Sequence, residues 1–188
     1  MPSPKNQLSS SSAAAATARD KKASEEALTQ AKNPGLFCVE LSNLFRVRLT
    51  EIALLRLKDG LLRFMFPEEL KTAGSIPVSS SAAVAAHTAA TKKVELFNNF
   101  VKVRHASIFE SVKLGDDDNP PRYDGATIQK LMSAPILDAE RRVLGVIQVC
   151  RKAHDLRSCG PDFTLDDLAQ LEVAANIAAK MSFMKEPA

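Results

Sequence analysis

Ile128-Gln-Lys-Leu-Met-Ser-Ala-Pro-Ile136 is an apolar stretch, and Val143-Leu-Gly-Val-Ile-Gln-Val149 follows it after a polar turn at residues 137–142. Two apolar runs of strand length that are separated by so short a turn predict a β-hairpin. The hairpin leads, after a polar loop, into a long helix. This order of elements decides the architecture of the domain.

The start of the final helix is signalled by Phe163-Thr-Leu-Asp-Asp167. Thr164 is a capping residue, and Asp167 is an acid at the third helical position, so the two form a variant of the capping box. We expect this helix to run from Leu165 to about Met184.

Two further signals lie upstream. Asn33-Pro34 predicts a helix start, because Asn caps helices and Pro suits the first helical position. Asp59-Gly60 lies between two apolar runs and predicts a tight hairpin turn, because both residues tolerate positive φ. We expect Leu62, Phe64 and Phe66 to share one face of the second strand of this hairpin.

The middle of the chain predicts a helix at residues 79–91, a short strand at 94–97, a helix within 100–112 and a loop at 114–125. The fold class is therefore α/β of the α+β type, with a central antiparallel sheet. The N- and C-terminal helices cover one face and the middle helices and loops cover the other. We expect residues 1–32 to form a low-complexity, disordered tail and residues 33–184 to form the domain.

Composition excludes several classes of protein. The chain has 188 residues, a net charge of +3, no Trp and a single Tyr, which disfavours nucleic-acid binding. Three cysteines without regular spacing disfavour a secreted disulfide framework. No apolar run is long enough for a membrane span, and the N-terminus lacks a signal peptide. These features predict a cytoplasmic protein with no membrane partner.

Residues 33–184 resemble a GAF domain, a small-molecule-binding relative of the PAS fold. The resemblance rests on Lys130–Ile136, on Val143–Val149 and on Phe163–Asp167, in this order and spacing. It implies a PAS/GAF-like sheet and a sensory or regulatory role.

The resemblance also implies a structural motif of Lys152, Phe163 and Asp167, in which the Lys and Asp tie a loop to the last helix. Cyclic-nucleotide-binding members carry Asn and Glu where this chain has Arg151 and Leu168. These two departures disfavour cyclic-nucleotide binding.

Some GAF domains are free methionine-(R)-sulfoxide reductases that use cysteines at the mouth of the pocket. This chain has no cysteine between Val39 and Val149. A thiol chemistry needs a thiolate, so the resemblance predicts that the chain is not an enzyme, with no catalytic residue and no cofactor. The same absence disfavours a covalently attached bilin.

Two metal sites are conceivable. Cys150, His154 and Cys159 lie within ten residues but lack a fourth ligand. The run Asp116–Asp118 with Asp124 suits a hard cation, although adjacent acids rarely converge on one point. We favour the structural interpretation for both and predict no metal. A disulfide between Cys150 and Cys159 is the redox alternative.

Our preferred hypothesis is a sensor domain whose unknown small-molecule ligand lies between the sheet and residues 77–112. Its expected lining combines polar groups that orient the ligand with apolar groups that desolvate it. The candidates are Phe66, Ser79, Asn98, His105, Phe109 and Met132.

The alternative is a dimerising interaction module with a vestigial pocket. The first and last helices would then pair with a second copy, or with another protein partner. Small side chains on the last helix suit such a close approach, namely Ala174, Ala175, Ala178 and Ala179.

Overall fold

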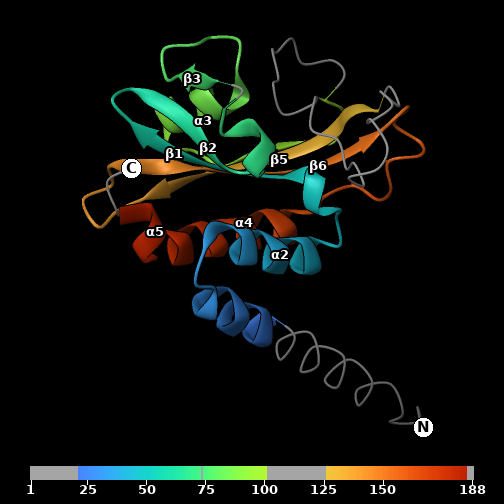
Figure 1. Cartoon of the computed structure of the whole chain (residues 1–188). Helices are drawn as coiled ribbons and strands as arrows, with labels where there is room; N and C mark the ends of the chain where they lie inside the picture. The colour runs from blue at the N-terminus through green and yellow to red at the C-terminus, as the bar shows by residue number, and fades with distance from the viewer. Residues whose placement is uncertain (1–20, 73, 101–125, 186–188) are drawn as a thin grey trace, which may run out of the picture.

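The structure is a computed structural model in which residues 21–72, 74–100 and 126–185 are described. These residues build one six-stranded antiparallel sheet of order β3-β2-β1-β6-β5-β4 (Figure 1). The strands are β1 Ile52–Lys58, β2 Leu61–Phe66, β3 Ser75–Pro77, β4 Glu95–Phe97, β5 Thr127–Leu137 and β6 Val143–Ala153.

Helices cover both faces of the sheet. α2 (Pro34–Phe45), α4 (Leu165–Ala178) and α5 (Ser182–Lys185) lie on one face, whereas α3 (Val84–Thr91) lies on the other (Figure 1). The predicted fold class, α+β with terminal helices on one face, is therefore confirmed. Two short 3₁₀ turns, Leu49–Glu51 and Glu68–Leu70, connect neighbouring elements.

Both predicted hairpins form. β5 and β6 pair from Thr127↔Ala153 to Leu137↔Val143. In the turn between β1 and β2, Asp59 has φ 53° and Gly60 has φ 75°, the left-handed conformations that the sequence of this turn favours.

The sheet separates two apolar clusters, because successive residues of a strand point to opposite faces. Ile52 and Leu54 of β1 pack with α2 and α4, and we call this the helix-layer cluster. Ala53 and Leu55 pack with α3, and we call this the α3-face cluster.

A β-bulge in β2 changes the face of Phe66. Leu54 pairs with Phe66, but the next residue, Leu55, pairs with Phe64, so Met65 is an extra residue in the ladder. Leu62 and Phe64 accordingly belong to the α3-face cluster, whereas Phe66 packs against the helix-layer cluster. The prediction that all three share one face is wrong for Phe66.

Two predicted helix boundaries also differ. α3 begins at Val84 rather than at residue 79, because the serines form turns: Ser80 N–H donates to Pro77 O at 2.9 Å, and the Ser80 hydroxyl accepts from the Ala82 N–H at 3.4 Å. The last helix breaks after α4, and the break lets Phe183 of α5 meet Phe37 edge to face, with 5.9 Å between ring centroids.

Packing begins before the predicted domain start at Asn33. Residues 21–30 are helical, and Leu28, only 1% exposed, joins the helix-layer cluster together with Ala31. The Lys21 ammonium lies 2.7 Å from the Asp166 carboxylate at the start of α4. Among the helices of the described ranges, none has the length and apolar character that crossing a membrane requires.

Gly145 in β6 allows the close approach of two elements. A Cβ at this position would lie 2.1 Å from the Leu55 carbonyl oxygen and 2.9 Å from Met184 Cε. We expect Gly145→Ala to lower the free energy of unfolding by at least about 2 kcal/mol, measured by urea denaturation, because the strands must separate to accept the methyl group.

Gly35→Ala is the matched control, since the nearest contact of its new Cβ is the Asn33 side chain at 3.4 Å. We expect this helical substitution to be neutral or to stabilise by about 0.5 kcal/mol. Equal stability of the two variants would contradict the role assigned to Gly145.

Candidate ligand site

A chain of buried polar side chains lies beneath α3, over the central strands. Thr88 of α3 and Ser133 of β5 are fully buried, and Gln148 of β6 is 7% exposed. The hydroxyls of Thr88 and Ser133 lie 2.8 Å apart, and the Gln148 amide N–H donates to the Ser133 hydroxyl over 3.4 Å. Helix and sheet are thus joined by hydrogen bonds within an apolar layer.

The polar chain continues to the surface. The Thr88 hydroxyl donates to a Glu95 carboxylate oxygen at 2.5 Å, and the other oxygen lies 2.9 Å from His87 Nδ1. Each hydroxyl has one proton, so Ser133 donates to Thr88 when Thr88 donates to Glu95. The Gln148 amide N–H then donates to Ser133 Oγ. Every donor in this series of hydrogen bonds therefore points toward the Glu95 carboxylate.

Apolar side chains surround this polar chain. The α3-face cluster draws its buried members from β1, β2, β5, β6 and α3. Buried polar groups in such a layer are costly unless they are hydrogen-bonded, which the three residues achieve with one another. The arrangement is the mixture of apolar walls and a few oriented polar groups that small-molecule sites use.

The structure brings together few of the site residues predicted from the sequence. Ser79 is exposed in the turn before α3. Phe66 and Met132 pack in or against the helix-layer cluster, on the face of the sheet away from α3, so they cannot line a site beneath it. His105 and Phe109 lie outside the described residues.

Asn98 has a structural role. Its Nδ2 donates to the Phe163 carbonyl at 2.9 Å, and its Oδ1 accepts from the Phe163 N–H at the same distance. The amide therefore behaves like a strand partner that holds the segment before α4 against the end of β4.

Lys130 ties the loop before α4 to the sheet. Lys130 of β5, nearly buried, donates to the Gly160 carbonyl and pairs with the Asp162 carboxylate, both at 2.7 Å. The Asp167 carboxylate instead accepts from Thr164 in the predicted capping box. The loop before α4 is thus fixed to β5 by Lys130.

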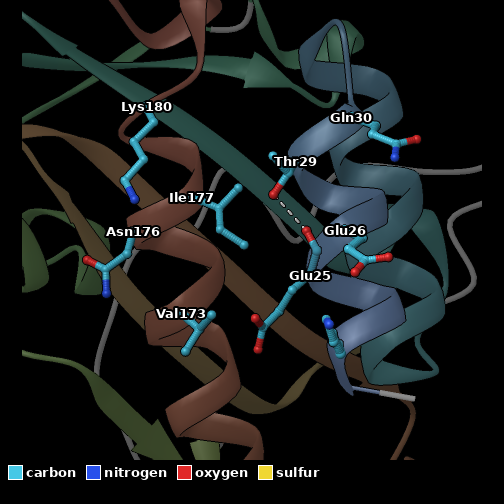
Figure 2. Close-up of a pocket in the computed structure, with 9 residues that line it drawn as sticks. Glu25, Glu26, Thr29, Gln30, Val173, Asn176, Ile177 and Lys180 are labelled. Carbon is cyan, nitrogen blue, oxygen red and sulfur yellow. Dashed lines mark hydrogen bonds between the residues drawn. The ribbon is translucent and has the colours of Figure 1, made fainter. Parts of the chain in front are cut away.

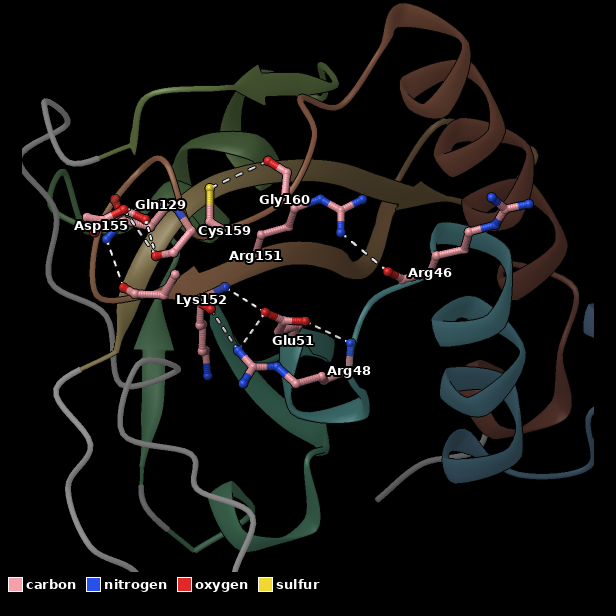
Figure 3. A network of polar contacts seen from close by, with 11 residues as sticks. Arg46, Arg48, Glu51, Gln129, Arg151, Lys152, Asp155, Cys159 and Gly160 are labelled. Atoms are coloured by element: carbon pink, nitrogen blue, oxygen red, sulfur yellow. Dashed lines mark hydrogen bonds and ion pairs between the residues drawn. The ribbon is translucent and has the colours of Figure 1, made fainter.

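Lys152 contributes through its backbone (Figure 3). The Glu51 carboxylate accepts from the Lys152 N–H at 2.6 Å, and the Arg48 guanidinium donates to the Lys152 carbonyl at 2.7 Å. Glu51 is buried and also accepts from Arg48. This network anchors the end of β6 to the turn before β1.

Arg151 connects three elements (Figure 3). Its guanidinium lies 4.7 Å from the centre of the Phe163 ring and donates to the Phe45 carbonyl. It also donates to the Arg46 carbonyl at the end of α2, the contact that Figure 3 draws. A cation over an aromatic face is favourable. The residue that differs from the cyclic-nucleotide-binding pattern is therefore part of the framework here.

The metal site considered for Cys150, His154 and Cys159 does not form. Cys150 is buried in the α3-face cluster, His154 is exposed, and within the described ranges no three His, Cys, Asp or Glu side chains are grouped to hold an ion. All three cysteines are described and none is in a disulfide bond, and burial raises the pKa of the Cys38 thiol. The acidic run Asp116–Asp118 and Asp124 lie outside the described residues.

Sequence reasoning missed Thr88, Ser133 and Gln148. Ser133 and Gln148 are single polar residues within apolar stretches, and Thr88 follows His87 in an alanine-rich stretch, so each is a weak signal on its own. Ser133 and Gln148 are directly paired across the β5–β6 hairpin, so the predicted pairing contained the information needed to bring them together.

Solved structures of similar fold span nearly the whole chain. The GAF domain of an Acinetobacter phosphoenolpyruvate-protein phosphotransferase aligns with a TM-score of 0.62 and 10% identity, covering 87% of this chain and 90% of that domain. A candidate GAF sensor protein from Burkholderia vietnamiensis aligns with a TM-score of 0.58 and 12% identity, covering 89% of this chain and 94% of that one.

The prediction that the chain is not an enzyme needs correction. A type II free methionine-R-sulfoxide reductase from Thermoplasma acidophilum aligns with a TM-score of 0.51 and 12% identity, covering 85% of this chain and 92% of that one. The fold therefore includes an enzyme among its similar structures, and likeness to a sensor fold does not exclude catalysis. At this level of identity the likeness shows the fold alone.

The sequence itself gives the family. No curated protein matches the sequence significantly. The sequence model of the GAF domain matches residues 37–181, which is most of the chain and includes the whole sheet, α4 and most of α2. The chain belongs to the GAF domain family.

Proposed function

We propose that this chain is a regulatory GAF domain that senses a small molecule bound on the α3 face of its sheet. The family is commonly sensory or regulatory, and the candidate sensor from Burkholderia vietnamiensis shares the fold. The observation that carries the proposal is the buried polar chain of Thr88, Ser133 and Gln148 at the centre of an apolar layer.

Gln148 is the member best suited to meet a ligand. Its hydrogen bond to Ser133 is 3.4 Å long, beyond the usual range for an N–H donor, so exchanging it for a bond to a ligand costs little. Thr88 and Ser133 lie closer to each other and hold α3 against β5. Binding would therefore shift α3 relative to the sheet by altering hydrogen bonds that already connect them.

A thermal-shift screen of metabolites and nucleotides on the full chain tests this proposal. We expect a compound that raises Tm, and we expect Gln148→Leu to weaken its affinity at least tenfold in calorimetric titration. The substitution keeps a similar side-chain volume while removing the amide.

Gln170→Leu is the matched control, because the Gln170 amide bonds Asp166 at the outer surface of α4. It should leave the affinity unchanged. A broad library without a stabilising compound, or a compound that binds the Gln148 variant as tightly as the wild type, would count against the α3-face site.

A second candidate function is dimerisation through the helix layer. Four of the five large apolar side chains that are markedly exposed in the described ranges belong to α2 or α4, namely Leu36, Val39, Leu165 and Val173. Val173 also lines the groove between the residue 21–30 helix and α4 (Figure 2). Apolar side chains gathered on one surface favour a protein interface.

The alanines of the last helix, which the sequence suggested as a dimer contact, do not lie on the surface. Ala174, Ala175, Ala178 and Ala179 are buried against the sheet of their own chain. They let α4 approach the strands closely and are not available to a second copy. An interface would use the opposite side of α4.

Light scattering of the full chain tests the dimer. We expect a dimer that becomes monomeric in the double variant Val39→Glu, Val173→Glu, because charges would replace the apolar contacts. Leu156→Glu, at a similarly exposed apolar residue in the loop before α4, should remain dimeric. A wild-type chain that stays monomeric at high concentration would refute this interface.

A further inference from the structure

A groove of about 1010 Å³ lies at the turn end of the β5–β6 hairpin. One wall is the end of β1 at Arg56–Lys58, and another is the hairpin turn from Leu137 to Leu144. The third wall comes from the end of α4 and from α5, through Ala179, Lys180 and Met184–Lys185. None of Thr88, Ser133 and Gln148 lines this groove, so its role does not depend on the function proposed above.

The lining of the groove is strongly basic. It contains the five basic residues Arg56, Lys58, Arg142, Lys180 and Lys185 and the two acidic residues Asp138 and Glu140. The surplus of three positive charges equals the formal net charge of the whole chain, so the rest of the sequence is neutral on balance. The groove therefore carries a local surplus of positive charge.

The two acids are engaged with one arginine. Arg142 Nε lies 2.7 Å from an Asp138 oxygen, and its Nη2 lies 3.1 Å from a Glu140 oxygen. Desolvation raises the pKa of Asp138, but hydrogen bonds from the Arg142 backbone and side chain outweigh it, so the pKa is lower than usual. The turn wall therefore carries two acids and one arginine, whereas Arg56, Lys58, Lys180 and Lys185 make the other two walls basic.

The floor of the groove is apolar. Leu137 and Leu144 are partly buried, and Met184 is buried over Gly145. A groove that offers apolar contacts between basic walls is complementary to a ligand with the opposite charge and an apolar face. Basic side chains on separate walls match several carboxylates better than a single anionic group.

We infer that this groove docks an acidic peptide segment of a partner protein, one that carries Asp or Glu together with large apolar side chains. The apolar side chains of the peptide would contact Leu137 and Leu144 beside Met184, and its carboxylates would face the basic walls formed by the end of β1 and by the end of α4 with α5. Charge attraction would set the rate of association and its dependence on salt.

A random dodecapeptide library displayed on phage, selected on the immobilised full chain, tests the inference. We expect the selected sequences to be enriched in Asp and Glu together with Leu, Ile or Phe. A synthetic peptide of the selected sequence should bind with a Kd that rises with salt concentration, because screening weakens the charge attraction. Replacing its apolar residues by Ser should weaken binding as well.

The double variant Lys180→Glu, Lys185→Glu should raise the Kd of that peptide at least tenfold. Both side chains are exposed, so the fold is retained, which circular dichroism and Tm verify. The matched control is Lys22→Glu, Lys32→Glu, with the same change of net charge at two exposed residues that do not line the groove. It should change the Kd less than twofold.

Three outcomes would overturn the inference. They are a selection without acidic enrichment, an acidic peptide that binds the Lys180, Lys185 variant as tightly as the wild type, and equal losses in both double variants. A dimer that is lost only in the Lys180, Lys185 variant would assign the groove to a second copy of this chain instead.

Discussion

The antiparallel pairing of β5 with β6 is the constraint on which the rest of the structure depends. The two strands pair along their full lengths, and β1 and β4 then add to their outer edges. Because both faces of this hairpin are covered, its register determines which residues meet the helix layer and which meet α3. A shift of one residue would exchange Leu131 with Met132 and place Ser133 on the wrong face.

Local chemistry made much of the fold predictable. The Asn33 cap, the Asp59-Gly60 turn and the Thr164–Asp167 capping box act within a few residues, and all three form. The bulge at Met65 was not predictable, because alternation along one strand carries no information on an extra residue opposite a partner. The face of Phe66 followed from that bulge and was therefore assigned incorrectly.

The candidate site was harder to predict than the fold. The roles of Asn98, Lys130 and Arg151 are set by partners that lie 30 to 106 positions away in the sequence. A polar residue near a predicted turn is ordinarily a surface residue, and its partner is visible only once the sheet is assembled. The family resemblance identified the correct region around β6 and α4, but it did not indicate Lys130, which fixes the loop before α4.

One hairpin carries both the polar chain beneath α3 and the basic groove. Ser133 and Gln148 lie in its buried stem, whereas Asp138 and Arg142 form its exposed turn. The stem is held by strand partners on both sides, so it moves as a unit, whereas the Arg142 side chain of the turn is largely exposed. A ligand that displaces the stem would therefore reshape the groove at its end. Linkage then requires that a peptide in the groove change the affinity for that ligand by the same factor.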